Sequence, residues 1–419
     1  MNRYNYKRGS ILNLRKPILL LFLVSLLSTC IDNFDPELRG LKAVLVVDAL
    51  ITNEHRSYEV KLSRTIPSQD SVTVMESGAL VIIKDQNGNE STFHENESGI
   101  YETDSLNFQG ETGNTYTLLI KTSGGTEYES DPCLMPPVQQ IDTIYYFKDQ
   151  EFQNNGTVFL DGIRIFIDSK NAGSGDYFRW IYNEWWKFSV PTPKLYDYID
   201  PENIPRVDTV KQVCYCFNGS DEIIIHSTES AQAEKIEKEP ILFIASGMSD
   251  RLLIQYCIEI KQLSLSEKEY RFWEQMKQIN ETTGNIFEKQ PFSIISNIHN
   301  INDPSEPVLG YFQVSGVEQK RIYITPEDIA ELNIPVYTYD CERIAIGPSN
   351  YPIPGISFDK IYKNYTDKGL YFIGPVWSPL GHSLDKLAFA SPVCADCTIR
   401  GSLTKPDFWI DIPPPQTKK

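Results

Sequence analysis

The sequence predicts a mainly β protein: an N-terminal immunoglobulin-like or transthyretin-like β-sandwich, followed by a larger β-rich domain that carries one well-signalled helix. Three observations predict this class. Apolar and polar residues alternate with a period of two in several short runs, Asn-Gly and Gly-Gly pairs separate such runs, and one segment has helical spacing behind a capping residue. A length of 419 residues suggests two or three domains.

The composition is acidic, with a formal net charge of −17 and a pI of about 4.8. Nucleic-acid binding needs clustered lysines and arginines that replace condensed counterions. We therefore exclude nucleic acid as a partner. Five histidines are scattered along the chain, and neither a metal site nor a cofactor is predicted from them.

Residues 1–29 have the features of a lipoprotein signal peptide. Five positive charges precede the apolar run 18–27, and no acidic residue occurs before Asp32. The run is too short for the ~20 residues that a membrane-spanning helix needs. It leads into Leu-Ser-Thr-Cys, which resembles a lipobox, although Thr29 departs from the usual small residue. We predict that Cys30 carries the lipid; the alternative is an ordinary cleaved signal with a chance cysteine.

Residues 30–40 are expected to form an acidic tether. Asp32, Asp35 and Glu37 lie close behind the cysteine and resemble the export signal of lipoproteins displayed outside the outer membrane. The alternative is a solvated tether without a sorting role. Removal of 1–29 takes away five positive charges and no negative ones, which changes the formal charge from −17 to −22. The predicted location is the outer membrane, lipid-anchored and facing the cell exterior.

Region 41–135 is expected to be the β-sandwich domain. Apolar residues alternate with charged ones in 58–62, the period of a half-buried strand. Asn87 and Gly88 follow another apolar run, and this pair is the strongest short-range hairpin signal. Three prolines within 132–137 cannot continue a central strand, so a linker is placed there.

Region 138–410 is expected to be the larger β-rich domain, with a polar tail at 411–419. Its one well-signalled helix begins at Ser266, where a capping box with Glu269 is expected, and ends near Gly284. A stripe of large apolar residues within it predicts that the helix packs on a sheet.

Because the chain is predicted to be exported, we expect its cysteines to form structural disulfides. An oxidising compartment favours these over zinc or thiol redox sites. Cys257 lies in an apolar run and is expected to be a buried free thiol. The preferred pair joins Cys341 to Cys394 or Cys397. The full set of disulfide candidates is Cys133, Cys214, Cys216, Cys341, Cys394 and Cys397.

Trp185 and Trp186 are weak candidates for ligand binding. With Tyr196 and Tyr198 they flank two prolines, a composition that suits an aromatic loop for sugar or peptide. The alternative is that these rings belong to the core of a large sandwich.

No catalytic motif is found. The segment 381–385 resembles a hydrolase nucleophile elbow, but its fifth residue is Asp385 and no histidine follows Ser383. Carboxylates such as Asp142 and Glu184 have no recognisable partner at glycosidase spacing. The chain is not predicted to be an enzyme.

Several segments in order together resemble a family of Bacteroidota outer-membrane lipoproteins catalogued as domain of unknown function 4249. The resemblance covers about 30–410. Its segments are 45–52, 58–64, 270–273, 284–287, 291, 297–298, 303–304, 309–312, 394–397 and 405–409.

This resemblance implies an outer-membrane lipoprotein, often encoded beside a TonB-dependent receptor, without catalytic residues to transfer. The leading hypothesis is a binding or accessory subunit of a TonB-dependent β-barrel transporter that captures glycan or peptide cargo. Two alternatives stay open: a cell-surface hydrolase of polysaccharide or peptide, and a structural or adhesive protein of surface assemblies.

Overall fold

The computed structural model describes residues 43–65, 74–104, 108–153, 156–170, 176–220, 222–229, 235–282, 296–381 and 383–413. The signal peptide, Cys30, the acidic tether and the end of the polar tail lie outside these ranges. Val44–Arg64 and Val74–Lys419 form one unit; the other, Met1–Ala43 with Thr65–Thr73, lies almost wholly outside the described residues.

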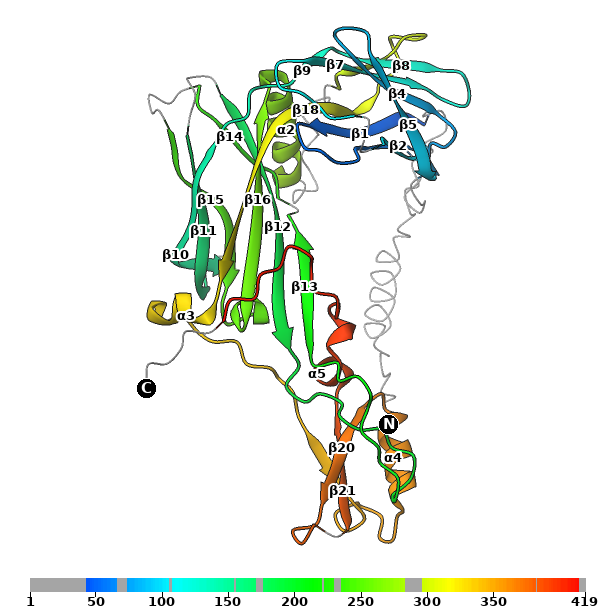
Figure 1. Cartoon of the computed structure of the whole chain (residues 1–419), viewed down its shortest axis with the longest axis vertical. Coiled ribbons are helices and arrows are strands. Elements are labelled where there is room, and N and C mark those ends of the chain that lie inside the picture. Colours follow the sequence, from blue (N-terminus) through cyan, green and yellow to red (C-terminus); the bar gives the residue numbers. More distant parts are fainter. Residues whose placement is uncertain are drawn as a thin grey trace, which may run out of the picture. The chain divides into compact units, whose positions relative to one another are not determined.

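The described residues form a mainly β protein, as the sequence predicts (Figure 1). The first region is a sandwich-like arrangement around one apolar core to which every second residue of β1 contributes. Its strands are β1 (Leu45–Thr52), β2 (Glu59–Arg64), β3 (Val74–Met75), β4 (Leu80–Asp85), β5 (Glu90–Glu97), β6 (Ile100–Glu102), β7 (Thr115–Lys121), β8 (Glu127–Ser130) and β9 (Cys133–Leu134).

The turn predicted at Asn87 and Gly88 is confirmed. It joins β4 to β5 in an antiparallel hairpin, and Gly88 has a φ of +87°, which costs glycine little. Asp85 fixes the turn because one of its carboxylate oxygens accepts the backbone N–H groups of Asn87 and Asn89, both at 2.8 Å.

Two strands from much later in the chain complete this region. β17 (Ile298–Asn300) pairs with β8, and the start of β18 (Leu309–Ile324) pairs in parallel with β1. Gly310 permits the parallel contact, because a Cβ there would lie 1.9 Å from the carbonyl oxygen of Val47. The sandwich therefore includes residues beyond the 41–135 expected from the sequence.

The second region consists of two facing sheets. A three-stranded sheet, in the order β10-β11-β15, faces β12, β16 and β18, which continue the first region's sheet because β18 runs from β1 to β16 (Figure 1). The strands are β10 (Ile141–Gln153), β11 (Val158–Lys170), β12 (Tyr177–Ser189), β13 (Val213–Gly219), β14 (Ile224–Ser227), β15 (Lys235–Ala245) and β16 (Gln255–Leu265).

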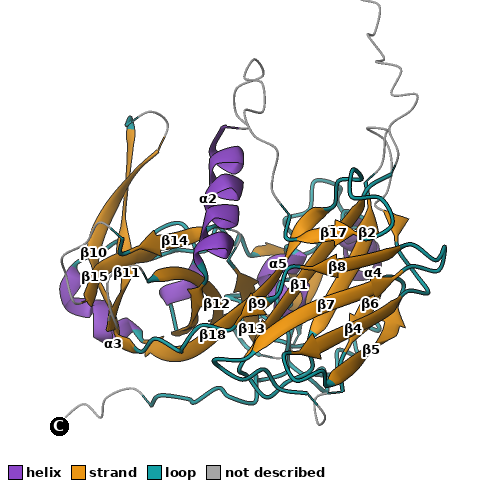
Figure 2. Ribbon diagram, turned by 90° about the horizontal axis from the view of Figure 1, so that it is seen from above, coloured by secondary structure: helices purple, strands orange, loops and turns teal. Residues whose placement is uncertain are grey.

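Alternation along β12 and β16 separates two cores. Trp180 and Ile258 point between the facing sheets, whereas Tyr177 and Leu263 point to the opposite face. Helix α2 (Glu267–Thr282) covers this opposite face, where Tyr270 joins the apolar cluster (Figure 2). The helix therefore packs on the sheet as its apolar stripe predicts.

The start of α2 differs in part from the predicted capping box. Ser266 Oγ accepts the backbone N–H of Glu269 at 3.2 Å, but the Glu269 carboxylate turns inward to Ser315. Gly284, the expected end of the helix, lies outside the described residues.

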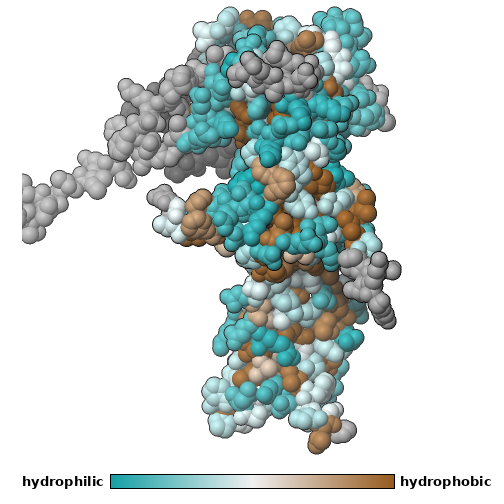
Figure 3. All heavy atoms as spheres, turned by 90° about the vertical axis from the view of Figure 1, so that its left-hand side faces the viewer, coloured by the Kyte–Doolittle hydropathy of each residue, from teal (hydrophilic) through white to brown (hydrophobic). Residues whose placement is uncertain are grey.

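A third sheet, in the order β19-β21-β20, forms the remaining part with α4 packed on it. On the face in Figure 3, apolar side chains form small patches between polar ones. No helix among the described residues is long and apolar enough to cross a membrane. The remaining elements are η2 (Asp250–Leu252), α3 (Pro326–Ile329), η3 (Ala330–Leu332), β19 (Ile344–Ile346), α4 (Phe358–Thr366), β20 (Tyr371–Trp377), β21 (Leu384–Ala390), α5 (Pro392–Ala395) and η4 (Cys397–Ile399).

Candidate functional site

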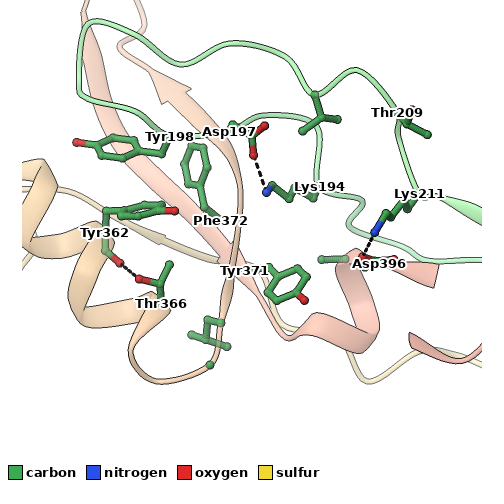
Figure 4. A pocket seen from close by; sticks show the side chains of 14 residues that line it. Lys194, Asp197, Tyr198, Thr209, Lys211, Tyr362, Thr366, Tyr371, Phe372 and Asp396 are labelled. Carbon is green, nitrogen blue, oxygen red and sulfur yellow. Dashed lines mark hydrogen bonds and ion pairs between the residues drawn. The ribbon is translucent and has the colours of Figure 1, made fainter. Parts of the chain in front are cut away.

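An open hollow of about 470 Å³ lies where the loop after β12 meets α4, the start of β20 and the α5–η4 turn (Figure 4). This volume is in the range of pockets that hold small ligands. Its lining combines aromatic rings, hydroxyl groups and two ion pairs: Lys194, Asp197, Tyr198, Val207, Thr209, Lys211, Tyr362, Thr366, Gly369, Leu370, Tyr371, Phe372, Ala395 and Asp396.

Both disulfides of the described residues meet at one wall of the hollow. Cys341 is bonded to Cys394, one of its two expected partners, and Cys214 is bonded to Cys397. The residues between these half-cystines, Ala395 and Asp396, line the hollow. The wall is therefore tied to strand β13 on one side and to the segment before β19 on the other.

Three cysteines of the described residues have free thiols, whereas the sequence predicts one, at Cys257. Cys257 is buried, as expected. Cys216 and Cys133, named as disulfide candidates, are corrected: Cys216 Sγ donates to the Arg400 carbonyl at 3.2 Å, and Cys133 Sγ accepts from Asn297 at 3.2 Å. Burial raises the pKa of Cys216 to about 11 and of Cys133 to about 12, which disfavours the reactive thiolate.

The loop after β12 is held in place by backbone hydrogen bonds. Thr192 N–H donates to the Cys394 carbonyl at 3.1 Å, and Lys194 N–H donates to the Ala395 carbonyl at 3.0 Å. One residue on, Leu195 N–H donates to the Ile373 carbonyl at 3.2 Å. These bonds make the loop an additional wall along the disulfide-linked segment and β20.

Aromatic rings form the opposite part of the hollow. Tyr198 and Tyr362 stack with centroids 4.5 Å apart, and the buried ring of Phe372 lies edge-on to both. Tyr198 donates its hydroxyl to Asp359 Oδ1 at 2.8 Å. Burial and this carboxylate raise the pKa of Tyr198, so the phenol stays neutral. Tyr371 is 36% exposed, and its side chain is available to a ligand.

Two ion pairs supply the charges of the hollow. Lys194 Nζ lies 2.6 Å from Asp197 Oδ1, and Lys211 Nζ lies 3.1 Å from Asp396 Oδ2. Burial alone would raise the pKa of Asp396, but hydrogen bonds from Thr398 and Lys211 outweigh it, and the pKa is lowered. The lining charges therefore cancel, and the carboxylates act as acceptors beside ammonium donors.

Trp185 and Trp186 do not line this hollow, and they do not lie together. Trp186 Nε1 donates to Asp250 Oδ1 at 3.1 Å. The Trp185 ring instead packs against Phe217 and Phe408, with ring centroids 5.3 and 4.6 Å apart. Neighbouring residues of a strand point to opposite faces, which separates the two indoles.

Among the other aromatic residues around Pro191 and Pro193, Tyr198 reaches the hollow, and Tyr196 packs behind it against Gly374.

Glu184 is fully buried, and both of its carboxylate oxygens have partners. It accepts hydrogen bonds from Tyr256 and Asn218, both at 2.8 Å, and Arg251 Nη2 lies 3.2 Å from its Oε1. This geometry suits a structural carboxylate. Among the described residues no group of three or more His, Cys, Asp or Glu side chains could hold a metal ion.

Tyr362, Tyr371 and Asp396 were missed in the sequence analysis. Asp396 had a usable signal, because a polar residue between two half-cystines is held in a fixed place. The tyrosines had none, since aromatic residues in a short helix and at the start of a strand are common and do not by themselves mark a site.

No curated protein matches this chain. A family model described as "Domain of unknown function (DUF4249)" matches residues 31–321, more than half of the chain. The loop side of the hollow, 194–211, lies inside the match, whereas α4, β20 and the disulfide-linked wall lie beyond it. The chain belongs to the DUF4249 family.

Proposed function

We propose that the protein is a lipid-anchored outer-membrane lipoprotein, facing the cell exterior, that acts as a binding or accessory subunit of a TonB-dependent transporter. The observation that carries the binding role is the hollow of Figure 4, which is open, lined with aromatic and polar side chains, and fixed by two disulfides. A rigid site loses less entropy when its ligand binds.

The N-terminal sequence supports the anchor. Cys30 follows the apolar run and precedes three carboxylates. Acyl chains contribute about 0.8 kcal/mol for each buried methylene, and more than one chain is needed for stable attachment. Disulfides agree with export, because they persist in oxidising compartments.

The anchor predicts that Cys30→Ala abolishes lipidation. In cells fed an alkyne-tagged palmitate, the native chain is expected to carry the label in the membrane fraction, and the variant is expected to carry none. Cys257→Ala is the matched control, because its thiol is buried and free. Equal labelling of the native chain and Cys30→Ala would contradict the anchor.

The partner is tested by native co-purification. The full-length lipidated protein, extracted in mild detergent, is expected to bring down a large TonB-dependent β-barrel in constant proportion. Recovery of other surface proteins without a barrel would support the adhesive alternative and reject the transporter role. Pull-down with Cys30→Ala controls for association after lysis.

A further inference from the structure

We propose that the hollow binds a short, neutral oligosaccharide. This inference rests on the proposed function of cargo capture and names the cargo of the same site. Three observations lead to it: the two ion pairs of the lining, the exposed side chain of Tyr371 in the same lining, and the hydrogen bonds that the surrounding backbone already makes.

The charges favour a neutral ligand with many hydroxyl groups. The lining has two lysines and two aspartates, and each lysine is paired with one aspartate. An ionic ligand would have to compete with one member of a pair for its partner, and the balanced charges of the lining give it no net attraction. A hydroxyl group needs no such displacement. An ammonium has three N–H donors and a carboxylate about four lone-pair sites, so both retain capacity for a sugar while they stay paired.

The aromatic rings supply the apolar part of sugar recognition. A pyranose ring has an apolar face of C–H groups and a rim of hydroxyls, so it suits a site where a ring lies beside polar groups. Tyr371, the first residue of β20, lines the hollow and is exposed to solvent. Thr209 and Thr366 add hydroxyl groups to the lining, and Figure 4 shows both ion pairs in the same hollow.

The backbone argues against an extended peptide. Peptides that add to a sheet edge need unpaired N–H and C=O groups. Along this wall the carbonyls of Ile373, Cys394 and Ala395 already accept bonds from the loop after β12, and the Lys211 carbonyl accepts the N–H of Cys397 at 3.0 Å. A ligand of this hollow must therefore be bound mainly by side chains, which suits a saccharide better than an extended peptide.

The test is isothermal titration calorimetry of the full lipidated chain in detergent. The neutral probes are maltotetraose, cellotetraose, xylotetraose and mannotetraose; tetragalacturonate is the acidic probe and tetra-alanine the peptide probe. We expect at least one neutral probe to bind. Tyr371→Ala should weaken that probe by about tenfold or more, because exposed aromatic contacts dominate such sites, whereas Tyr371→Phe should keep most of the affinity.

Two further variants keep the test decisive. Lys194→Met removes a donor from the rim and should weaken the same probe even if Tyr371→Ala folds poorly. Phe152→Ala removes a ring on β10, outside the hollow, from a residue that is 61% exposed, and should leave binding unchanged. Binding of none of the neutral probes, a preference for tetragalacturonate or tetra-alanine, or full affinity in both hollow variants would overturn the inference.

The ligand inference and the transporter role can fail separately. If a barrel co-purifies but the protein binds no oligosaccharide, the transporter role stands and the ligand inference is rejected. If an oligosaccharide binds but no barrel co-purifies, the ligand inference stands and the transporter role is rejected.

Discussion

Replacement of both Cys214 and Cys397 by alanine is expected to lower the free energy of unfolding by about 5 kcal/mol. The bond spans a sequence separation of 183 residues, so its loss returns a large loop entropy to the unfolded chain. The Cys341–Cys394 bond spans 53 residues, and the same argument gives about 4 kcal/mol. Both bonds hold the segment with Ala395 and Asp396, so either loss is also expected to loosen the hollow.

Guanidinium unfolding followed by tryptophan fluorescence measures these changes. Cys216→Ala is the matched control, because it lies two residues from Cys214 on β13 and has a free thiol. Its loss of a weak bond to the Arg400 carbonyl should cost about 1 kcal/mol. A Cys214→Ala/Cys397→Ala variant as stable as this control would show that the two sulfurs are not bonded in the native protein.

Local patterns predicted the local elements. The hairpin at Asn87 and Gly88 and the N-terminal end of α2 at Ser266 depend on neighbouring residues, and both are confirmed. The parallel pairing of Val46 with Leu309 joins residues more than 250 positions apart, and no local pattern specifies such a register. Gly310 was the available signal, because glycine within an apolar strand often marks close backbone approach.

The site was predictable only in part for the same reason. Tyr198 was named because aromatic residues are dense around it, and it lines the hollow. Tyr362, Tyr371 and Asp396 reach the hollow from separate segments that only the tertiary fold brings together. Trp185 and Trp186 were named for the same density, but strand geometry sends adjacent side chains to opposite faces.

The second large effect is expected at Glu269, whose replacement by glutamine should remove a pH dependence of stability. Glu269 lies in the first turn of α2 and is 1% exposed. Burial raises its pKa from 4.5 to about 7, against the opposing effects of the Ser315 hydroxyl and the Arg179 guanidinium. Arg179 itself stacks on Trp273, with its guanidinium 3.3 Å from the ring centroid, and is charged at neutral pH although burial lowers its pKa to about 10.

The sign follows from the raised pKa. Below pH 4.5 Glu269 is protonated in both the folded and the unfolded chain, and its neutral form is tolerated inside. Between pH 4.5 and about 7 the unfolded chain loses this proton while the folded chain keeps it. The free energy of unfolding therefore falls as pH rises through this interval, by about 3 kcal/mol for this one group.

Glu269→Gln keeps an oxygen that can accept the Ser315 hydroxyl, which donates to Glu269 Oε1 at 3.0 Å in the native protein, but it has no proton to lose. We expect the variant to match the native chain near pH 4.5 and to be more stable at pH 8 by about 3 kcal/mol, because the pKa of about 7 for Glu269 already includes the attraction to Arg179. Urea unfolding at half-unit steps from pH 4.5 to 8 measures the slope of stability against pH. Glu274→Gln, on the same helix but solvent-accessible, should leave that slope unchanged. Parallel curves for the native chain and Glu269→Gln would show that this carboxyl ionises with the same pKa in the folded and unfolded states, which its burial between α2 and the sheet argues against.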